Sequence, residues 1–543
     1  MPDDLPNLPS IGPVATFFGD ENAPVFGVYH ASTATPRMAV LLLSPFGAED
    51  MSAHRGWRDF AQSLADTGLP CLRFDYPGTG DSCGMDAEAD HLAAWLAAAH
   101  SGADWLRAVA GVESLAVVGL RLGSLLATEL ARTRADVESL LQIAPPRNGQ
   151  AYVRELKMLA SATAVPAGDA ALAPDPTNGM HAGAIFAAGF VLNAATCDAL
   201  RRLQPPAQLR TPWVAVVDRE EMPLGPDWLK ALVLPAGSRK AYAALSGYGP
   251  MMLTAHLAVP PLAVYAHARK VLQQVAKFVP PGSARPVAGC VQSAVEVSLR
   301  ALALRESVVD SIGPYGMSGI LTEPTSRRRR NGHAVLVLNS SAERRIGPNG
   351  MWVLFARERA ARGDMVLRFD LPGLGESPDN PADTGHPVYP ARAIECIRAA
   401  LDFLRHKSNG ASVTVVGLCS GAFHALNSVV DGLEIKRAVI INPFILRKNG
   451  DEPVDLSAQG GQAKAITENA VRNLRDPQRW LKLLRGQVNV GTILGSMVHR
   501  TGVRVLVAAK RAGRALNLIP HLPVTRDLQK AIKRKVHLHF VFA

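Results

Sequence analysis

The sequence predicts an α/β protein in which two doubly wound sheets follow one another along the chain. One observation is that short apolar runs, typical of buried strands, take turns with stretches that place apolar residues at helical spacing. Another is a decapeptide, RFDxPGxGxS, which occurs at Arg73–Ser82 and again at Arg368–Ser377. A third is a pentapeptide, GLRLG at Gly119–Gly123 and GLCSG at Gly417–Gly421. Both motifs recur after about 300 residues, which predicts a duplicated domain rather than a short-period solenoid.

The first copy supplies strands and helices in the order that such a sheet requires. Its apolar runs from Met38, Leu115 and Leu141 do not alternate with polar residues, which predicts strands buried on both faces. Residues 56–70 place apolar side chains at helical spacing and reach a glycine that can end a helix. Strands and helices in this alternation predict a parallel sheet with helices on both faces.

The second copy repeats this order. Apolar runs begin at His333, Val413 and Val439, and residues 352–364 form the corresponding helical stretch. Proline and glycine cluster at Lys277–Gly289, as expected of a linker. We therefore predict one domain over residues 1–282 and a second over residues 283–543.

Composition and charge argue against several classes of function. Of the 543 residues, 48% are hydrophobic and 19% charged, and no apolar run is long enough for a transmembrane segment. The six cysteines include no C-x-x-C pair, which predicts free thiols and no metal site. Much of the net charge of +11 lies at Arg327–Arg330 and Arg504–Lys535 without a nucleic-acid-binding motif, so we expect no nucleic acid partner. The acidic, proline-rich start differs from a signal peptide, and we expect a cytoplasmic protein without a cofactor.

The pentapeptide at Gly417–Gly421 has the spacing of a nucleophile elbow. Two glycines between a strand and a helix permit the sharp turn that points Cys419 out at the carboxyl edge of the sheet. A thiol at a helix N-terminus is expected to be partly thiolate, so Cys419 is the candidate nucleophile. The backbone N–H groups of Ser420 and of Ser340, in the loop after an earlier strand, would form an oxyanion hole. The alternative interpretation of Cys419 is a small buried residue at a tight turn.

The order of these motifs resembles the α/β-hydrolase superfamily over essentially the whole chain, with two copies in tandem. The segments GLRLG, RFDYPGTGDS and RRIGPNG are also similar to the α/β hydrolases of bacterial exopolysaccharide (exosortase-associated) clusters. A cysteine at the elbow resembles the dienelactone hydrolase branch. The resemblance implies ester, thioester or lactone chemistry on a small molecule through an acyl-enzyme.

The first copy keeps the glycines of the elbow but has Arg121 in place of a nucleophile. Asp218 ends the run WVAVVD, and His256 follows GYGPMMLTA, roughly where the acid and base of the family fall. Without a nucleophile we expect these residues to be structural and the domain to be degenerate or a binding domain. An arginine at the mouth of a pocket suits a carboxylate or a phosphate, since its donors form a fixed fork.

The second copy has no evident base. Its final run, VHLHFVFA, corresponds to WVAVVD of the first copy, so we expect the equivalents of Asp218 and His256 to lie beyond Ala543. A fragment, a natural truncation and a protein that only binds all remain open, and the downstream reading frame would distinguish them. The sequence does not select a base among the candidate histidines: His424, His499, His521, His537 and His539.

Two functions follow from these observations. In one, the second domain is a hydrolase that acts on a small ester or thioester through Cys419. In the other, the chain is a non-catalytic tandem protein that binds an acyl or glycan intermediate, or a partner enzyme. Turnover that is lost in Cys419→Ala would indicate the first function, and binding that is lost in Arg121→Ala would indicate the second.

Overall fold

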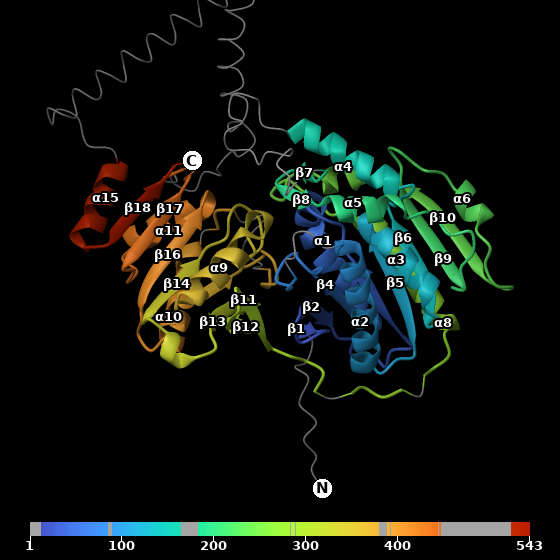
Figure 1. The fold of residues 1–543 in the computed structure, drawn as a ribbon, viewed down its shortest axis with the longest axis horizontal. Coiled ribbons are helices and arrows are strands. Elements are labelled where there is room, and N and C mark those ends of the chain that lie inside the picture. Colours follow the sequence, from blue (N-terminus) through green and yellow to red (C-terminus); the bar gives the residue numbers. More distant parts are fainter. Residues whose placement is uncertain are drawn as a thin grey trace, which may run out of the picture.

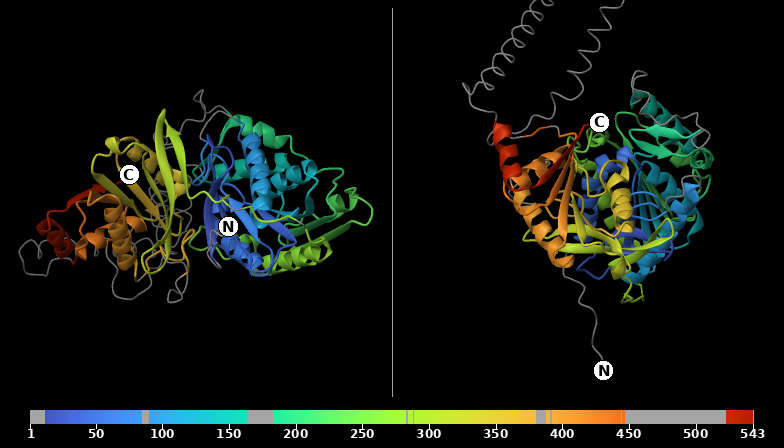
Figure 2. Two further views of the ribbon diagram at one scale, coloured as in Figure 1. Left: turned by 90° about the horizontal axis from the view of Figure 1, so that it is seen from below. Right: turned by 60° about the vertical axis from the view of Figure 1, so that its left-hand side comes forward.

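The structure contains two eight-stranded sheets that lie side by side, one from each half of the chain (Figure 1). Figure 2 shows the same arrangement from two further directions. The structure is a computed structural model, and it describes residues 12–84, 90–163, 183–282, 284–287, 289–379, 388–390, 392–443, 445–446 and 523–542.

The first sheet has the strand order β1-β2-β4-β3-β5-β6-β9-β10. β2 pairs antiparallel with both β1 and β4, and the strands from β4 to β10 run parallel to one another. The bounds are β1 (Pro13–Phe18), β2 (Val25–His30), β3 (Met38–Leu43), β4 (Cys71–Phe74), β5 (Ser114–Leu120), β6 (Val137–Ile143), β9 (Trp213–Arg219) and β10 (Arg239–Leu245). The carboxyl ends of the parallel strands therefore meet at one edge, where sites in such sheets lie.

Helices cover both faces of this sheet, and β3 shows why its sequence is apolar throughout. Ala39 and Leu41 pack into the core with α2 (His91–Ala110) and α3 (Leu122–Thr133). The intervening residues, including Val40, pack with α1 (Ala48–Ala65) and α8 (Leu262–Phe278). Burial on both faces is what the uninterrupted apolar runs predict, and the predicted helix at 56–70 corresponds to α1.

The remaining elements of the first half lie around the carboxyl edge. α4 packs against β7 and α5, and α5 also contacts α2. β7 and β8 form a separate antiparallel hairpin. The bounds are α4 (Gly149–Thr163), β7 (Ile185–Ala187), β8 (Phe190–Leu192), α5 (Ala194–Arg201), α6 (Asp227–Ala231) and α7 (Tyr248–Met251).

The second sheet has the order β11-β12-β13-β15-β14-β16-β17-β18. From β13 to β18 this is the order of β2 to β9 in the first sheet, and β18 pairs parallel with β17 as β9 pairs with β6. The predicted correspondence between the two runs VHLHFVFA and WVAVVD is thus confirmed by strand order. The bounds are β11 (Ala294–Leu299), β12 (Leu302–Ile312), β13 (Met317–Pro324), β14 (His333–Val337), β15 (Met365–Phe369), β16 (Ser412–Leu418), β17 (Arg437–Ile441) and β18 (His537–Val541).

The helices of the second half follow the same plan. α10 (Ala393–Lys407), α11 (Ser420–Val430) and α15 (Pro523–Lys533) contribute to the core on one face of the sheet. α9 (Met351–Ala361), where the sequence predicts a helix, packs on the other face. Two short 3₁₀ turns, η2 (Arg327–Arg329) and η3 (Pro348–Gly350), precede β14 and α9. None of the helices in the described ranges combines the length and apolarity that crossing a bilayer would require.

The two sheets meet through their antiparallel strands. Phe17 of β1 pairs with Gln292 in an isolated antiparallel bridge. Phe26 and Val28 of β2 form one apolar cluster with Ile320 of β13. The contact between the two halves is therefore packed like a protein core, and it is not a loose linker contact.

Candidate functional site

The second elbow is a sharp turn between β16 and α11 with Cys419 at its tip. Cys419 has φ 56° and ψ −111°, a conformation that residues other than glycine rarely adopt. Its N–H donates to the Ile441 carbonyl at 3.0 Å, which holds the turn against β17. The flanking glycines are needed, because a Cβ on Gly417 would collide with the Gly421 carbonyl and one on Gly421 would lie 2.6 Å from the Asn339 oxygen. This strained backbone is what the nucleophile position of such a turn requires.

The loop after β14 lies directly against this turn. The backbone N–H of Ser341 donates to the Ser420 hydroxyl at 2.7 Å, which ties the loop to the residue after Cys419. Ser340 and Ser420 are both buried. The structure therefore brings the candidate nucleophile close to both residues that the sequence selects for an oxyanion hole. Because Ser341 already uses its N–H, Ser340 remains the candidate donor from this loop.

The thiol of Cys419 is half-buried, and its pKa is raised from the ordinary value. Burial is the largest cause, the N–H of Ser420 acts in the opposite direction, and the carboxylate of Glu343 raises the pKa further. The expectation of a partly ionised thiol is therefore wrong. The helix N-terminus does supply an N–H, but burial and a nearby negative charge outweigh it. A nucleophile in this place has to give its proton to a base.

Glu343 is the functional candidate that the sequence analysis misses. Its Oε2 atom is buried and has no hydrogen-bond partner among the described residues, and burial raises its pKa to about 7. The hydroxyls of Tyr389 and Ser340 are likewise buried without a partner in the described part of the chain. Burial, and then the charge of Cys419, raises the pKa of Tyr389 to about 12. Buried polar groups are seldom left unpaired, so this cluster is suited to a bound molecule.

The first elbow has the same backbone with a different side chain. Arg121 has φ 54° and ψ −116°, and its N–H donates to Ile143 at 3.1 Å, as that of Cys419 does to Ile441. A Cβ on Gly119 would collide with the Gly123 carbonyl, so the glycines are again required. The turn is therefore kept without a nucleophile.

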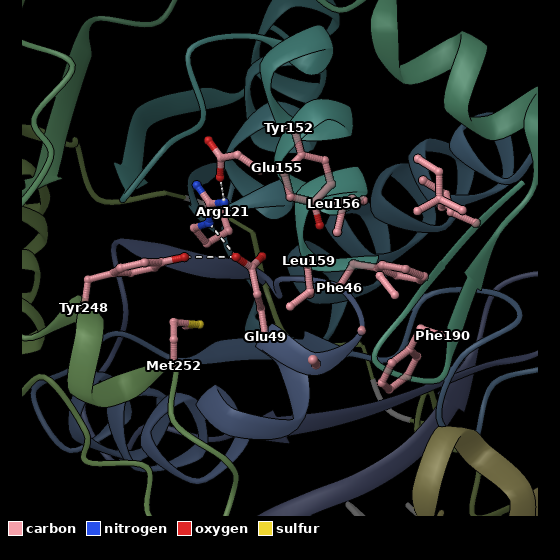
Figure 3. Close-up of a pocket in the computed structure, with 15 residues that line it drawn as sticks. Phe46, Glu49, Arg121, Tyr152, Glu155, Leu156, Leu159, Phe190, Tyr248 and Met252 are labelled. Carbon is pink, nitrogen blue, oxygen red and sulfur yellow. Dashed lines mark hydrogen bonds and ion pairs between the residues drawn. The ribbon is translucent and has the colours of Figure 1, made fainter. Parts of the chain in front are cut away.

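The guanidinium of Arg121 is held by carboxylates of its own domain (Figure 3). Its Nε donates to Glu49 Oε1 at 2.7 Å, and its Nη2 donates to Glu155. It also lies over the rings of Tyr152 and Tyr248, at 5.7 and 5.4 Å from their centroids. The guanidinium, which the sequence suggests for a ligand's carboxylate or phosphate, is thus already paired with two carboxylates of the protein.

Asp218 and His256 do not join Arg121 in one cluster. The carboxylate of Asp218 accepts from the Tyr242 hydroxyl at 3.0 Å and from the backbone N–H groups of Arg219 and Leu224. His256 is half-buried, and burial lowers its pKa. Within the described ranges, no hydrogen bond or ion pair links either residue to Arg121. The bonds of Asp218 to the backbone of Arg219 and Leu224 instead stabilise the turn after β9.

The histidines of the second copy are poorly placed to act as a base on Cys419. His424 is buried on α11, its Nε2 donates to the Val388 carbonyl at 3.0 Å, and burial lowers its pKa to about 4. His537 and His539 lie beside Arg437 and Val439, toward the opposite end of the strands from the elbow. His499 and His521 lie outside the described residues.

Comparisons with known proteins find a family match over part of the second half of the chain. Residues 345–534 match the α/β hydrolase family. Similar solved structures include a proline iminopeptidase from Mycobacterium smegmatis, with 16% identity over 49% of this chain and 100% of that one, at a TM-score of 0.34. An α/β hydrolase domain-containing protein from mouse has 16% identity over 49% and 99%, at 0.32. The hydrolase GrgF from a Penicillium species has 16% identity over 50% and 98%, at 0.33. No curated protein matches the chain.

Proposed function

Because residues 345–534 match the α/β hydrolase family, we propose that the second domain hydrolyses a small ester or thioester through an acyl-enzyme on Cys419. The observation that carries this proposal is the strained elbow, with the Ser420 N–H directed at the sulfur and the Glu343 carboxylate acting on the thiol. Oε2 of Glu343 is buried and has no hydrogen-bond partner in the part of the chain that the structure describes. A side chain held in this conformation has a cost in stability, and such strain persists mainly where function needs it.

Glu343 is the proton acceptor in this proposal. Its pKa of about 7 places it near the pH at which a general base is most effective. It follows β14 in the loop that approaches the elbow, so it comes from a different part of the fold than the acid and base that the family resemblance implies. The raised pKa of Cys419 makes such a base necessary.

The reaction proceeds in two balanced steps. In the first, the Cys419 thiol gives its proton to Glu343, the sulfur bonds to the carbonyl carbon, and the bond to the leaving alcohol or thiol breaks as Glu343 returns the proton to it. In the second, water gives a proton to Glu343 and attacks the acyl carbon. The carbon–sulfur bond then breaks, the acid is released, and the thiol is protonated again by Glu343.

Backbone donors would stabilise the negative oxygen in both steps. The N–H of Ser420 lies at the start of α11, where the helix dipole also favours negative charge. The N–H of Ser340 is the second donor, held near the first by the bond between Ser341 and Ser420. Preorganised donors of this kind typically contribute a factor of about 10² to 10³ in rate.

Turnover of p-nitrophenyl acetate and of acetyl-CoA by the full chain tests the proposal. We expect Cys419→Ala to lose at least about a hundredfold in rate. Cys290→Ala is the matched control, because Cys290 is half-buried like Cys419 but lies in the segment between the domains, and it should retain the parent rate. Absence of turnover by the parent on both substrates, or equal rates for the two variants, would overturn the proposal.

A further inference from the structure

A cavity of about 270 Å³ lies beside Arg121 in the first domain (Figure 3). A cavity of roughly 150 Å³ is enough to hold benzene, so this one has room for a larger molecule. Its wall is mainly apolar and comes from the loop after β3, from α4 and from the β7–β8 hairpin. The apolar lining includes Phe46, Leu156, Leu159, Ile185, Phe190 and Met252.

The cavity has one polar end, formed by groups whose hydrogen bonds are incompletely satisfied. Glu49 accepts from Arg121 at 2.7 Å and from the Tyr248 hydroxyl at 2.9 Å, both through Oε1. Its other oxygen, Oε2, is buried and has no partner among the described residues. The hydroxyl of Tyr152, a fully buried residue of α4, is also without a partner in the described part of the chain. In Figure 3 the carboxylate of Glu49 and the ring of Tyr152 approach the same region from opposite sides.

These groups select the chemistry of a ligand. Glu49 Oε2 can only accept a hydrogen bond, and the Tyr152 hydroxyl can donate or accept one. An alcohol meets both needs, since its O–H donates to the carboxylate while its oxygen accepts from the tyrosine. An anion is disfavoured, because two carboxylates, Glu49 and Glu155, line this end and both are already paired with Arg121.

We propose that this cavity binds a small apolar alcohol, with its hydroxyl between Glu49 and Tyr152 and its carbon chain against the hairpin and α4. Arg121 stands where a nucleophile would stand, so the molecule is bound and not cleaved. The site is separate from Cys419, and the proposal does not depend on the activity of the second domain.

Binding of hexan-1-ol and hexanoate to the full chain, measured by saturation-transfer NMR titration, tests the proposal. The two probes share a carbon chain and differ in the head group. We expect saturable binding of the alcohol and at least tenfold weaker binding of the acid. Comparable affinity for both, or no saturable binding of hexan-1-ol, would overturn the proposal.

A pair of tyrosine variants locates the binding. Tyr152→Phe removes one hydroxyl that has no partner among the described residues, so the fold should be kept, and the affinity for hexan-1-ol should fall about fivefold. Tyr242→Phe makes the same change away from the cavity, where the hydroxyl donates to Asp218, and should leave the affinity unchanged. Equal affinities of the two variants would place the alcohol elsewhere and contradict the proposal.

Discussion

Arg73 and Glu376 form a buried ion pair between the two domains, with Arg73 Nη1 2.8 Å from Glu376 Oε1 and side chains only 6% and 4% exposed. The corresponding residues of the other decapeptide form the reverse pair, in which Arg368 Nη1 lies 2.5 Å from Asp81 Oδ1. Each copy of RFDxPGxGxS thus gives its arginine to one pair and its acid to the other. This reciprocity is that of an isologous dimer interface, here within one chain.

Glu376→Gln should destabilise the protein by about 3–5 kcal/mol, because it leaves the buried guanidinium of Arg73 without its carboxylate. Asp379→Asn is the matched control: Asp379 also pairs across the domains, with Arg58, but its side chain is 50% exposed, so the loss should stay below about 1 kcal/mol. Chemical unfolding measures both changes. Similar losses for the two variants would show that burial does not set the strength of these pairs.

The stability of the parent should depend on His54 as the pH falls from about 7.5 to 5. His54 lies 3.1 Å from Glu376, and burial, followed by the charge of Arg344, lowers its pKa to about 3. In the unfolded state the histidine has a pKa of about 6.5 and is protonated at a higher pH than in the folded state. The contribution of neutral His54 to the free energy of unfolding is therefore full above about pH 6.5 and is lost as the pH falls toward 3.

The variant His54→Gln separates the contribution of His54 from that of groups whose effect on stability changes with pH in the opposite direction. Burial raises the pKa of Asp50 to about 6 and that of Glu343 to about 7. A carboxyl group whose pKa is raised by folding makes the folded protein less stable as the pH increases. Both remain in His54→Gln. Unfolding midpoints at several pH values should therefore fall more steeply with acid in the parent than in the variant, and parallel curves would refute this role of His54.

Replacing Glu343 should have opposite effects on two properties of Cys419. Glu343→Gln removes the carboxylate that raises the thiol pKa, so iodoacetamide should alkylate Cys419 faster at neutral pH. The same change removes the proposed base, so turnover should fall by about 10² to 10⁴. Peptide mapping and steady-state rates measure the two effects. Glu358→Gln is the control, since Glu358 lies in α9 and pairs with Arg300, and its replacement should change neither property.

The value of kcat/KM for the parent should increase as the pH is raised past about 7, because Glu343 then loses its proton and can act as a base. The profile of residual activity in Glu343→Gln should lack this step. A parent profile that is flat between pH 6 and 8 would exclude Glu343 from the reaction.

Alkylation should also separate the six cysteines by burial. Cys419 and Cys290 are half-buried, whereas Cys71, Cys83, Cys197 and Cys396 are buried. We expect the first two to be labelled before the other four. A partly ionised Cys419 would be labelled ahead of every other thiol, but no such lead over Cys290 is expected, because the pKa of Cys419 is raised. Labelling of Cys419 among the slowest would identify it as a buried turn residue.

The sequence predicted the sheets and the two elbows because those features are written in local patterns. Uninterrupted apolar runs such as the one from Met38 specify strands buried on both faces, and paired glycines around Arg121 and Cys419 specify a strained turn. The partners of these turns were not predictable in this way. The ionisation of Cys419 depends first on burial and then on the charge of Glu343, some 75 residues earlier, and a local pattern contains neither.

The ion pairs between the two decapeptides could not be predicted for the same reason. Their acids, Asp81 and Glu376, stand in turns of the kind that usually lie at the surface, and no feature of the sequence indicates that they are buried. Their arginine partners belong to the other copy, about 300 residues away, so the pairing depends on how the two domains pack against each other. Likewise, the sequence allows the hypothesis that Arg121 pairs a ligand's carboxylate or phosphate, and only the folded structure brings Glu49 and Glu155 to it.

Intact-protein mass spectrometry after brief mixing with p-nitrophenyl acetate tests the central claim most directly. The account predicts one added acetyl group on the parent, located at Cys419 by peptide mapping, and its absence from Cys419→Ala. Glu343→Gln should acquire the same group more slowly, because acylation then lacks its base. An acetyl group that persists in Cys419→Ala, or a parent that remains unmodified while it releases p-nitrophenol, would contradict the claim that Cys419 is the nucleophile.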